Sequence, residues 1–506
     1  MGISMPPSSL LTLSDAGLAI VPGSIASAGG AEWALARTPH GPRLVIAPDA
    51  AAWAPPDGFA GERAERDGRA MFVGPAGEAN AAVLRAAMPW LVARPLPPGT
   101  SAGFGDRMGV ATPGHVRALR AVAAPIAPIF AQQSIREMTR TGRTPQAVMD
   151  DATWGTFEAG WTGGVGADAD HLKTPDDIDA CAAAGFSFFT IDPGAHVNDR
   201  ADSASPSDLL AAFDALPWAR LEYDGASLVA ALAGKGHDFE GHRVAIDEAA
   251  VVKAAVKYGL AVAHVALMYR HLREVKRDEA FDLEVSVDET ESPTSPAEHV
   301  YIASELQRLG VRWISLAPRF VGRFEKGVDY IGDLGAFEAD IAVHAAIARH
   351  FGSYKLSLHS GSDKFSIYGI AARHTRGSVH LKTAGTSYLE ALRAVAQVSP
   401  ALFRAVYTFA RDRYTEDRAS YHVSALLERA PDPAGLADGD LAGVLEQFDA
   451  RQVLHVTFGS VLTARTASGA AVFADDIMAL LEAHPDVYAG CLERHFVRHL
   501  RPFVRA

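Results

Sequence analysis

Cysteine is almost absent from this chain. Its 506 residues contain only Cys181 and Cys491, which lie far apart and form no CxxC motif. No disulfide framework is therefore implied. Both residues lie in apolar, helix-like stretches, so we expect two buried thiols. Such thiols are typical of a reducing compartment, and we expect a cytoplasmic protein.

We also expect no signal peptide and no membrane span, and the sequence has no excess of positive charge. Its first residues lack a basic segment followed by an apolar core, and polar residues interrupt every apolar stretch well before about 18 positions. The sequence has 60 Asp and Glu residues and 47 Lys and Arg residues, which gives a net charge of −13. We therefore expect neither a membrane nor nucleic acid as partner, but a small-molecule substrate. A homo-oligomer is compatible with this composition.

Motifs for nucleotide binding are missing as well. The sequence contains no P-loop and no GxGxxG after a strand, so a nicotinamide cofactor has no support. What is present is the composition of a globular protein, with 48% hydrophobic and 21% charged residues. The length favours two or three structural units.

Three regions differ in pattern. Residues 1–100 contain short β-like runs separated by Gly, Pro and Asp turns and then one helical stretch, which predicts a small β-rich α+β domain. Residues 101–390 alternate between strand and helix, and residues 391–506 are mainly helical, which predicts a C-terminal extension packed on the middle region. Residues 200–275 are longer than one strand–helix unit needs, and we interpret them as a lid.

Eight strand-like runs in the middle region predict a closed (β/α)8 barrel of the TIM type. In chain order they are RMGVATP, PIFAQQS, GVGADADHL, SFFTIDPG, DLEVSVDE, RWISLAPRF, KLSLHSGS and SVHLKTAG. In such barrels the active site lies at the carboxyl ends of the strands. The polar residues that end these runs are therefore the candidate site.

Histidines gather at those ends. The third run ends in Asp170 and His171, and strand alternation points His359 and His380 into the barrel from the last two runs. Imidazole nitrogens beside carboxylates suit a divalent cation, which could be Zn, Ni, Mn, Fe or Co. We therefore predict a metal held by these three histidines. The helical histidines His299, His344 and His350 are interpreted as exposed.

Other polar strand ends suggest roles in catalysis and substrate binding. Asp170 could act as general base or cap the next helix, although Thr174 and Asp176 are better placed as caps. Asp288 or Glu289 could be the second acid or base or a metal ligand, with Glu289 slightly favoured as the acid. Arg319 and Lys382 could hold a substrate carboxylate or form a structural ion pair. The remaining predicted substrate contacts are Gln133 and Ser360.

Several long motifs resemble the tagaturonate epimerase family of hexuronate catabolism. They are FGDRMGVATPGH, DADHLKT, SVDETESPTSP, WISLAPRFVGRFEKGVDYIGDL, YKLSLHSGSDKFSIY and HLKTAGTSYLEAL. The resemblance implies metal-dependent interconversion of D-tagaturonate and D-fructuronate. It also implies His171, His359 and His380 as metal ligands, Asp170 as proton acceptor and an acidic residue of VDET as proton donor. Weaker likeness to class II aldolases lies in DHL and HSGS.

The chemistry of that reaction favours C–C cleavage. The two sugar acids differ at a carbon β to the ketone, so loss of its C–H proton gives an anion without resonance into the carbonyl. A retro-aldol step, in which Asp170 deprotonates the hydroxyl and the metal stabilises the resulting enediolate, avoids this problem. Other ketose 4-epimerases, a class II-like sugar aldolase and a non-catalytic sugar-acid-binding or aldolase-supporting barrel remain as alternatives.

Overall fold

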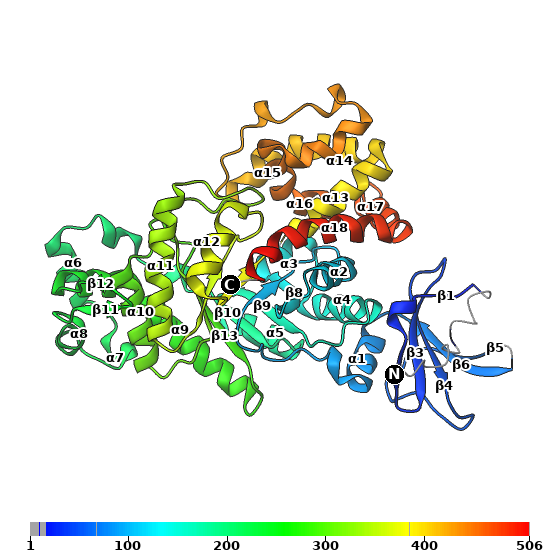
Figure 1. Cartoon of the computed structure of the whole chain (residues 1–506), viewed down its shortest axis with the longest axis horizontal. Coiled ribbons are helices and arrows are strands. Elements are labelled where there is room, and N and C mark those ends of the chain that lie inside the picture. Colours follow the sequence, from blue (N-terminus) through cyan, green and yellow to red (C-terminus); the bar gives the residue numbers. More distant parts are fainter. Residues whose placement is uncertain (1–9, 11–16, 67, 384, 505–506) are drawn as a thin grey trace.

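The computed structural model describes residue 10 and residues 17–66, 68–383 and 385–504. A strand-rich N-terminal region, a parallel barrel and a helical C-terminal region follow one another along the chain and pack together (Figure 1). This arrangement confirms the predicted fold class.

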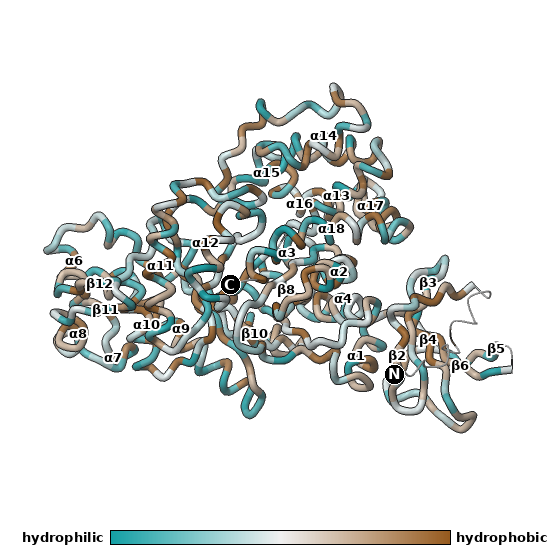
Figure 2. The backbone as a smooth tube through the Cα atoms, viewed as in Figure 1, coloured by the Kyte–Doolittle hydropathy of each residue, from teal (hydrophilic) through white to brown (hydrophobic). Residues whose placement is uncertain are grey.

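The N-terminal region is an antiparallel sheet covered by one helix. Its described strands pair in the order β1-β3-β4-β6-β5, and β2 pairs with β3. Apolar residues such as Trp33, Leu44 and Ile46 are buried between the sheet and α1, and Figure 2 shows this apolar character along β3 and β4. The elements are β1 Ala19–Ile20, β2 Ala26–Ala28, β3 Ala31–Arg37, β4 Arg43–Pro48, β5 Glu62–Arg66, β6 Arg69–Pro75 and α1 Glu78–Ala87.

Within the described residues, eight parallel strands close into a barrel in the order β10-β13-β14-β15-β16-β7-β8-β9. Nearly all their residues are buried, because helices cover the outer face and side chains fill the interior. The strands are β7 Ser101–Gly103, β8 Ala127–Ser134, β9 Gly166–Leu172, β10 Phe188–Ile191, β13 Asp282–Ser286, β14 Ser315–Ala317, β15 Lys355–Leu358 and β16 Val379–Lys382.

The first barrel strand lies earlier than predicted. RMGVATP is not a strand, and β7 lies at Ser101–Gly103, in the Pro- and Gly-rich stretch that resembles a linker. This short strand is defined by its neighbours β16 and β8 rather than by local pattern. The predicted segment instead forms a turn in which the carboxylate of Asp106 accepts the backbone N–H groups of Met108, Gly109 and Ala111.

Helices surround the barrel, and two of them, α5 and α10, begin with the N-terminal caps that their sequences predict. Thr174 and Asp177 form a capping box at α5, and Ser295 and Glu298 form another at α10. Asp170 is therefore not needed as a cap. The helices are α2 Thr112–Val122, α3 Ile135–Thr141, α4 Pro145–Glu158, α5 Pro175–Ala183, α9 Glu248–Lys276, α10 Pro296–Arg308, α11 Leu334–His350, α12 Phe365–Thr375 and α13 Thr386–Val398.

Residues 200–275 form three short helices and a hairpin before the long helix α9. These elements are α6 Pro206–Asp214, α7 Trp218–Leu221, α8 Gly225–Leu232, β11 His237–Phe239 and β12 His242–Val244, and they lie at one end of the molecule (Figure 1). Among the described helices only α9 is long and apolar enough to cross a membrane, but 83% of its most apolar window is buried within the fold. It packs as a core helix.

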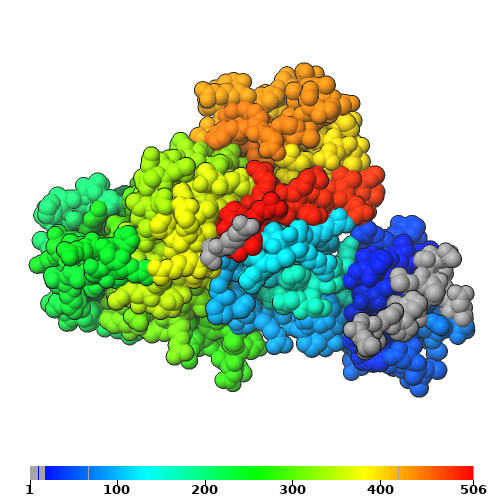
Figure 3. All heavy atoms as spheres, in the orientation of Figure 1, coloured from blue at the N-terminus to red at the C-terminus, as the bar shows by residue number. Residues whose placement is uncertain are grey.

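The C-terminal region lies beside the barrel and returns to it through its last helix. Its main helices are α14 Pro400–Asp417, α15 Phe448–Val456, α16 Phe458–Thr463, α17 Ala474–Ala483 and α18 Pro485–Leu500. In Figure 3 the red C-terminal residues lie against the cyan first part of the barrel. A Cβ atom on Gly114 of α2 would come within 2.5 Å of Leu492 of α18, so this glycine permits the close contact.

Two histidines that we interpreted as exposed are buried instead. His299 and His344 are both 0% exposed, and their Nδ1 atoms are 2.8 Å apart. The Nε2 atom of His299 also lies 2.5 Å from the hydroxyl of Tyr354. Hydrogen bonding to polar partners allows imidazoles to occupy a helix–helix interface, which helical periodicity alone does not reveal. His350 is exposed, as expected.

Candidate functional site

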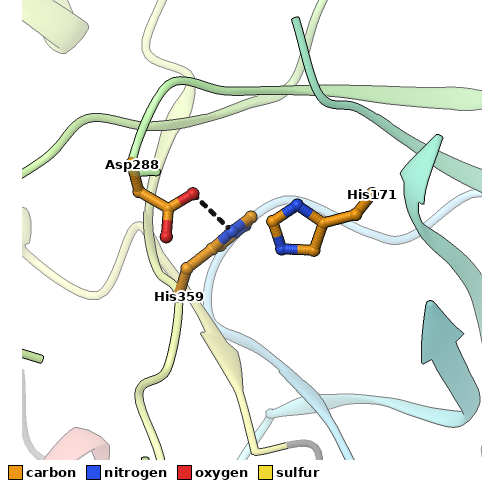
Figure 4. Close-up of side chains that lie close together, drawn as sticks. All are labelled: His171, Asp288 and His359. Atoms are coloured by element: carbon orange, nitrogen blue, oxygen red, sulfur yellow. Dashed lines mark ion pairs between the residues drawn. The ribbon is translucent and has the colours of Figure 1, made fainter. Parts of the chain in front are cut away.

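Three side chains converge at the carboxyl end of the barrel. They are His171 from β9, Asp288 from just after β13 and His359 from just after β15, and each offers one donor atom within 4.8 Å of the others. Figure 4 shows them directed toward one another. Two imidazoles and one carboxylate so arranged form a donor set that a divalent cation can occupy.

A bulge in β9 allows two adjacent residues to serve the same site. Neighbouring side chains on a regular strand point to opposite faces. Here the pairing with β10 shifts register near the end of β9, and His171 has a φ of 53°, in the left-handed region. His171 Nε2 therefore lies only 3.8 Å from the Asp170 carboxylate. Such a conformation costs about 1–3 kcal/mol and is concentrated at functional sites.

Each of the two histidines is oriented by a carboxylate on its other ring nitrogen. His171 Nδ1 is 3.2 Å from Asp192, and His359 Nε2 is 2.6 Å from Glu284. This leaves His171 Nε2 and His359 Nδ1 for the site, the second of them 3.1 Å from Asp288. Histidines that bind metals are typically held in this way. Burial would lower the pKa of His359, but Asp288 and Glu284 outweigh it and raise the pKa to about 10.

Lys382 does not have the free charge that a substrate carboxylate needs. Its ammonium lies 2.5 Å from Asp170 and 2.9 Å from both Asp168 and Glu284. Burial alone would raise the pKa of Asp170, but Lys382 and the nearby histidines hold it below its ordinary value. Lys382 therefore positions Asp170 and keeps it ionised.

His380 is not brought to the other two histidines. Alternation along β16 correctly placed it inside the barrel, but it precedes Lys382 by two residues and so lies about 7 Å deeper. Its Nδ1 atom is 2.8 Å from the Ser101 hydroxyl, and its Nε2 atom is 4.0 Å from Asp168. Strand phase determines which face of the sheet a side chain lies on, but not how deep in the barrel it lies.

The two acidic residues of VDET occupy different places. Asp288 belongs to the converging group, whereas Glu289 is 37% exposed and pairs with Arg136 at 3.2 Å. A carboxylate oxygen of Glu289 still lies within 4.8 Å of a ring nitrogen of His171. Asp170 and Glu289 thus both lie close to the same imidazole.

Two cavities open beside this group. The outer cavity, of about 300 Å³, is lined by residues that include Asp288, Glu289, Arg319 and His422. The deep cavity, of about 30 Å³, is lined by residues that include Arg107, Asp170 and His171. Residues common to both are Arg136, Lys326, His359, Ser360 and Tyr421.

The residues that line the two cavities show which predicted substrate contacts a substrate could reach. Arg319 and Ser360 line them, and the Arg319 side chain has no ion-pair partner among the described residues. Gln133 does not line them: its amide donates to the Asp106 carbonyl and accepts from Arg143, so it supports the turn before α2. The described lining residues of both cavities include none from 200–275, and the lid stays a prediction.

Sequence reasoning missed the contribution of two loops. Lys326 comes from the segment between β14 and α11, and Tyr421 and His422 come from the C-terminal region. The motif FEKG contains Lys326, but it lies in a loop beyond the strand ends, where strand phase says nothing of side-chain direction. The C-terminal region gave no signal, because nothing in its helical pattern shows that a connecting loop reaches the barrel.

Comparison with known proteins identifies the family of the chain. The family model of tagaturonate epimerase matches residues 23–503. The Tagaturonate/fructuronate epimerase of Thermotoga maritima is 43% identical over 469 residues, which cover 92% of this chain and 93% of that protein. The chain belongs to the tagaturonate epimerase family. It is therefore an enzyme of the isomerase class, an epimerase, and the non-catalytic alternative is set aside.

Solved structures support the same assignment. The native crystal structure of the fructuronate-tagaturonate epimerase from Cohnella laeviribosi matches with a TM-score of 0.91 at 35% identity. The match covers 98% of each chain. A glycerol complex of the same Cohnella protein matches with a TM-score of 0.90. The resemblance seen in the sequence motifs is confirmed.

Proposed function

We propose that this enzyme interconverts D-tagaturonate and D-fructuronate. The observation that carries the proposal is the group of His171, His359 and Asp288 beside Asp170, in a chain of the tagaturonate epimerase family. The Thermotoga and Cohnella relatives are named for this pair of sugar acids. Sequence identities of 43% and 35% over nearly the whole length support transfer of the substrate pair.

A divalent cation fits the converging group. His171 Nε2, His359 Nδ1 and the Asp288 carboxylate would hold it, while Asp192 and Glu284 orient the rings. The donor set suits Zn, Ni, Mn, Fe or Co. When bound, the cation supplies Lewis-acid polarisation of the substrate ketone. Asp288 thus replaces His380 in the ligand set expected from the sequence.

The position of the inverting carbon in the substrate determines which proton Asp170 can remove. This carbon lies β to the ketone, so its C–H proton is not acidified by the carbonyl. We propose that Asp170 removes the proton of the hydroxyl on this carbon, and the neighbouring C–C bond then breaks to give an enediolate and an aldehyde. The Lys382 ammonium, 2.5 Å from Asp170, keeps the base ionised and fixes its orientation.

Glu289 is the proposed proton donor for bond re-formation. After the aldehyde turns, the C–C bond forms on its other face, and the new alkoxide needs a proton. Asp288 is engaged by His359, whereas Glu289 is tied only to Arg136 and faces the outer cavity. One forward turnover leaves Asp170 with one proton more and Glu289 with one fewer, so the substrate gains and loses one proton. Exchange of protons with water then restores both carboxyl groups, and in the reverse direction Glu289 accepts and Asp170 donates. Ser360 and Arg319 are proposed to contact substrate hydroxyl groups.

The conversion itself can be followed by NMR. We expect protein loaded with one of the five metals to form fructuronate from tagaturonate, and to reach the same mixture from fructuronate. A heat-inactivated sample provides the blank. No conversion in either direction with any of the five metals, by protein that remains folded by circular dichroism, would reject the proposed substrate pair.

A cytoplasmic location is proposed from the state of the two cysteines. Cys181 and Cys491 are both free and buried, as expected from the sequence. Free thiols fit a reducing cytoplasm, where catabolism of small sugar acids takes place.

A further inference from the structure

The deep cavity contains Lys326, which forms no close ion pair with a carboxylate of the described residues, although the Glu137 carboxylate that pairs with Arg107 is near enough to interact with it. Lys326 donates from Nζ to the Ser360 hydroxyl at 2.6 Å. Within the part of the chain that the structure describes, no Asp or Glu forms an ion pair with it. The other lysine of this cavity, Lys382, is surrounded by three carboxylates. Lys326 is therefore available to an anion that enters the cavity.

Arg107, on the wall of the same cavity, has an unused donor. It is 5% exposed, and its Nε and Nη2 atoms donate to Glu137 at 3.0 and 2.6 Å. Its guanidinium also lies over the ring of Phe458, 3.5 Å from the centroid. The Nη1 atom is buried without a hydrogen-bond partner among the described residues. Buried donors are rarely left unpaired, so this one points to a ligand.

The size of the deep cavity fits a small anionic group. One water-sized group needs roughly 10–15 Å³, and the deep cavity has about 30 Å³. It can therefore take two such groups, which is what the two oxygens of a carboxylate require. Charge-assisted hydrogen bonds from an arginine and a lysine would compensate for the loss of water.

The direction of the substrate chain leads the carboxylate to this cavity. Asp170 acts on the hydroxyl of the inverting carbon, and the carboxylate carbon lies two C–C bonds further from the ketone. Asp170 lines the deep cavity and not the outer one, whereas Asp288 and Arg319 line the outer cavity and not the deep one. A substrate with its ketone near Asp288 and its inverting carbon at Asp170 thus extends its acid end toward Arg107.

We propose that Lys326 and Arg107 bind the carboxylate of the sugar acid and make the enzyme select uronates over neutral ketoses. Arg319 then faces the opposite, ketone-bearing end of the substrate. This inference rests on the proposed function, because the position of Asp170 relative to the inverting carbon sets the direction. It names the specificity-determining residues of that site.

Two ligands that do not react can test the proposed carboxylate site by binding alone, without catalysis. D-galactonate and galactitol differ only in a carboxylate, and their binding to metal-loaded protein can be measured by calorimetry. We expect the wild type to bind galactonate more tightly than galactitol. Lys326→Met should weaken galactonate about 30-fold, the range for a hydrogen bond to a charged group, and leave galactitol unchanged. Lys235→Met, on an exposed lysine within residues 200–275 and outside both cavities, is the matched control.

Kinetics then locate the effect. Lys326→Met should raise the KM for tagaturonate more than it lowers kcat, and Lys326→Arg should restore most of the loss because it restores the charge. Arg319→Met should weaken galactonate and galactitol by similar factors. Arg107 is better tested by Arg107→Lys than by removal, since its ion pair with Glu137 is buried.

Two results would overturn the inference. One is equal affinity of the wild type for galactonate and galactitol, and the other is full galactonate affinity in Lys326→Met. Failure of the proposed function looks different: galactonate would bind in a Lys326-dependent manner while tagaturonate was not converted. If conversion occurred and Arg319→Met alone removed the preference for galactonate, the function would stand and the carboxylate would lie at Arg319.

Discussion

Replacing Asp170 by asparagine is expected to lower kcat by about 1,000-fold while metal binding persists. The asparagine keeps the size of the side chain and can still accept a hydrogen bond from Lys382, but it cannot accept the substrate proton. General base catalysis contributes about 10²- to 10⁴-fold, and a loss of 1,000-fold corresponds to about 4 kcal/mol. The measurement is steady-state epimerisation, with bound metal determined by elemental analysis.

Asp214→Asn is the matched control for this variant. Asp214 is the exposed last residue of α6, outside both cavities. We expect it to retain wild-type activity. Activity of Asp170→Asn within a few-fold of the wild type, at equal metal content, would show that another group accepts the proton.

The second large effect is on metal content. Asp288→Ala and His359→Ala each remove one of the three converging donors, so we expect bound metal to fall from about one per chain to less than a tenth, with loss of activity. Ligand removal weakens binding at least as much as loss of an orienting partner, which typically costs 10- to 100-fold. His380→Gln is expected to retain the metal, because His380 lies in a deeper layer with Ser101.

These variants distinguish two ligand sets. Retention of metal by Asp288→Ala together with its loss in His380→Gln would restore the three-histidine site and reject the one proposed from the structure. His484→Ala, on an exposed residue before α18, is the control for histidine loss. Circular dichroism of each variant separates loss of a ligand from loss of the fold, since His359 and His380 are both buried.

The barrel could be predicted from sequence because its signal is repeated. Seven of the eight predicted runs overlap an observed strand, and buried apolar residues alternate with inward polar ones in several of them. The exception, β7 at Ser101–Gly103, has only three residues and depends on pairing with β8 and β16. A strand of that length carries too little pattern to be found locally.

The candidate site was predictable only where strand phase determines position. Position at a strand end indicated His171, phase pointed Asp288 and His359 into the barrel, and the structure brings the three together. Phase could not distinguish the depth of His380 from that of Lys382, which ends the same strand. Nor could it show that Lys382 is already neutralised, because Asp168 and Glu284 come from other strands.

Residues outside the strands were beyond such reasoning. Arg107 lies in a turn after β7, and Tyr421 comes from a C-terminal segment that the chain reaches only after α14. Their arrival at the barrel mouth is set by the packing of the C-terminal region on the barrel. No spacing or periodicity in the sequence contains that information.

The most direct measurement of the central claim is the fate of hydrogen at the inverting carbon. In the proposed mechanism Asp170 deprotonates a hydroxyl group and a C–C bond breaks, so the C–H bond of the inverting carbon stays intact. Epimerisation of tagaturonate in D₂O, followed by NMR of the fructuronate formed, should therefore show full protium at this carbon. Deuterium incorporated there in step with turnover would contradict the account and establish proton abstraction from carbon.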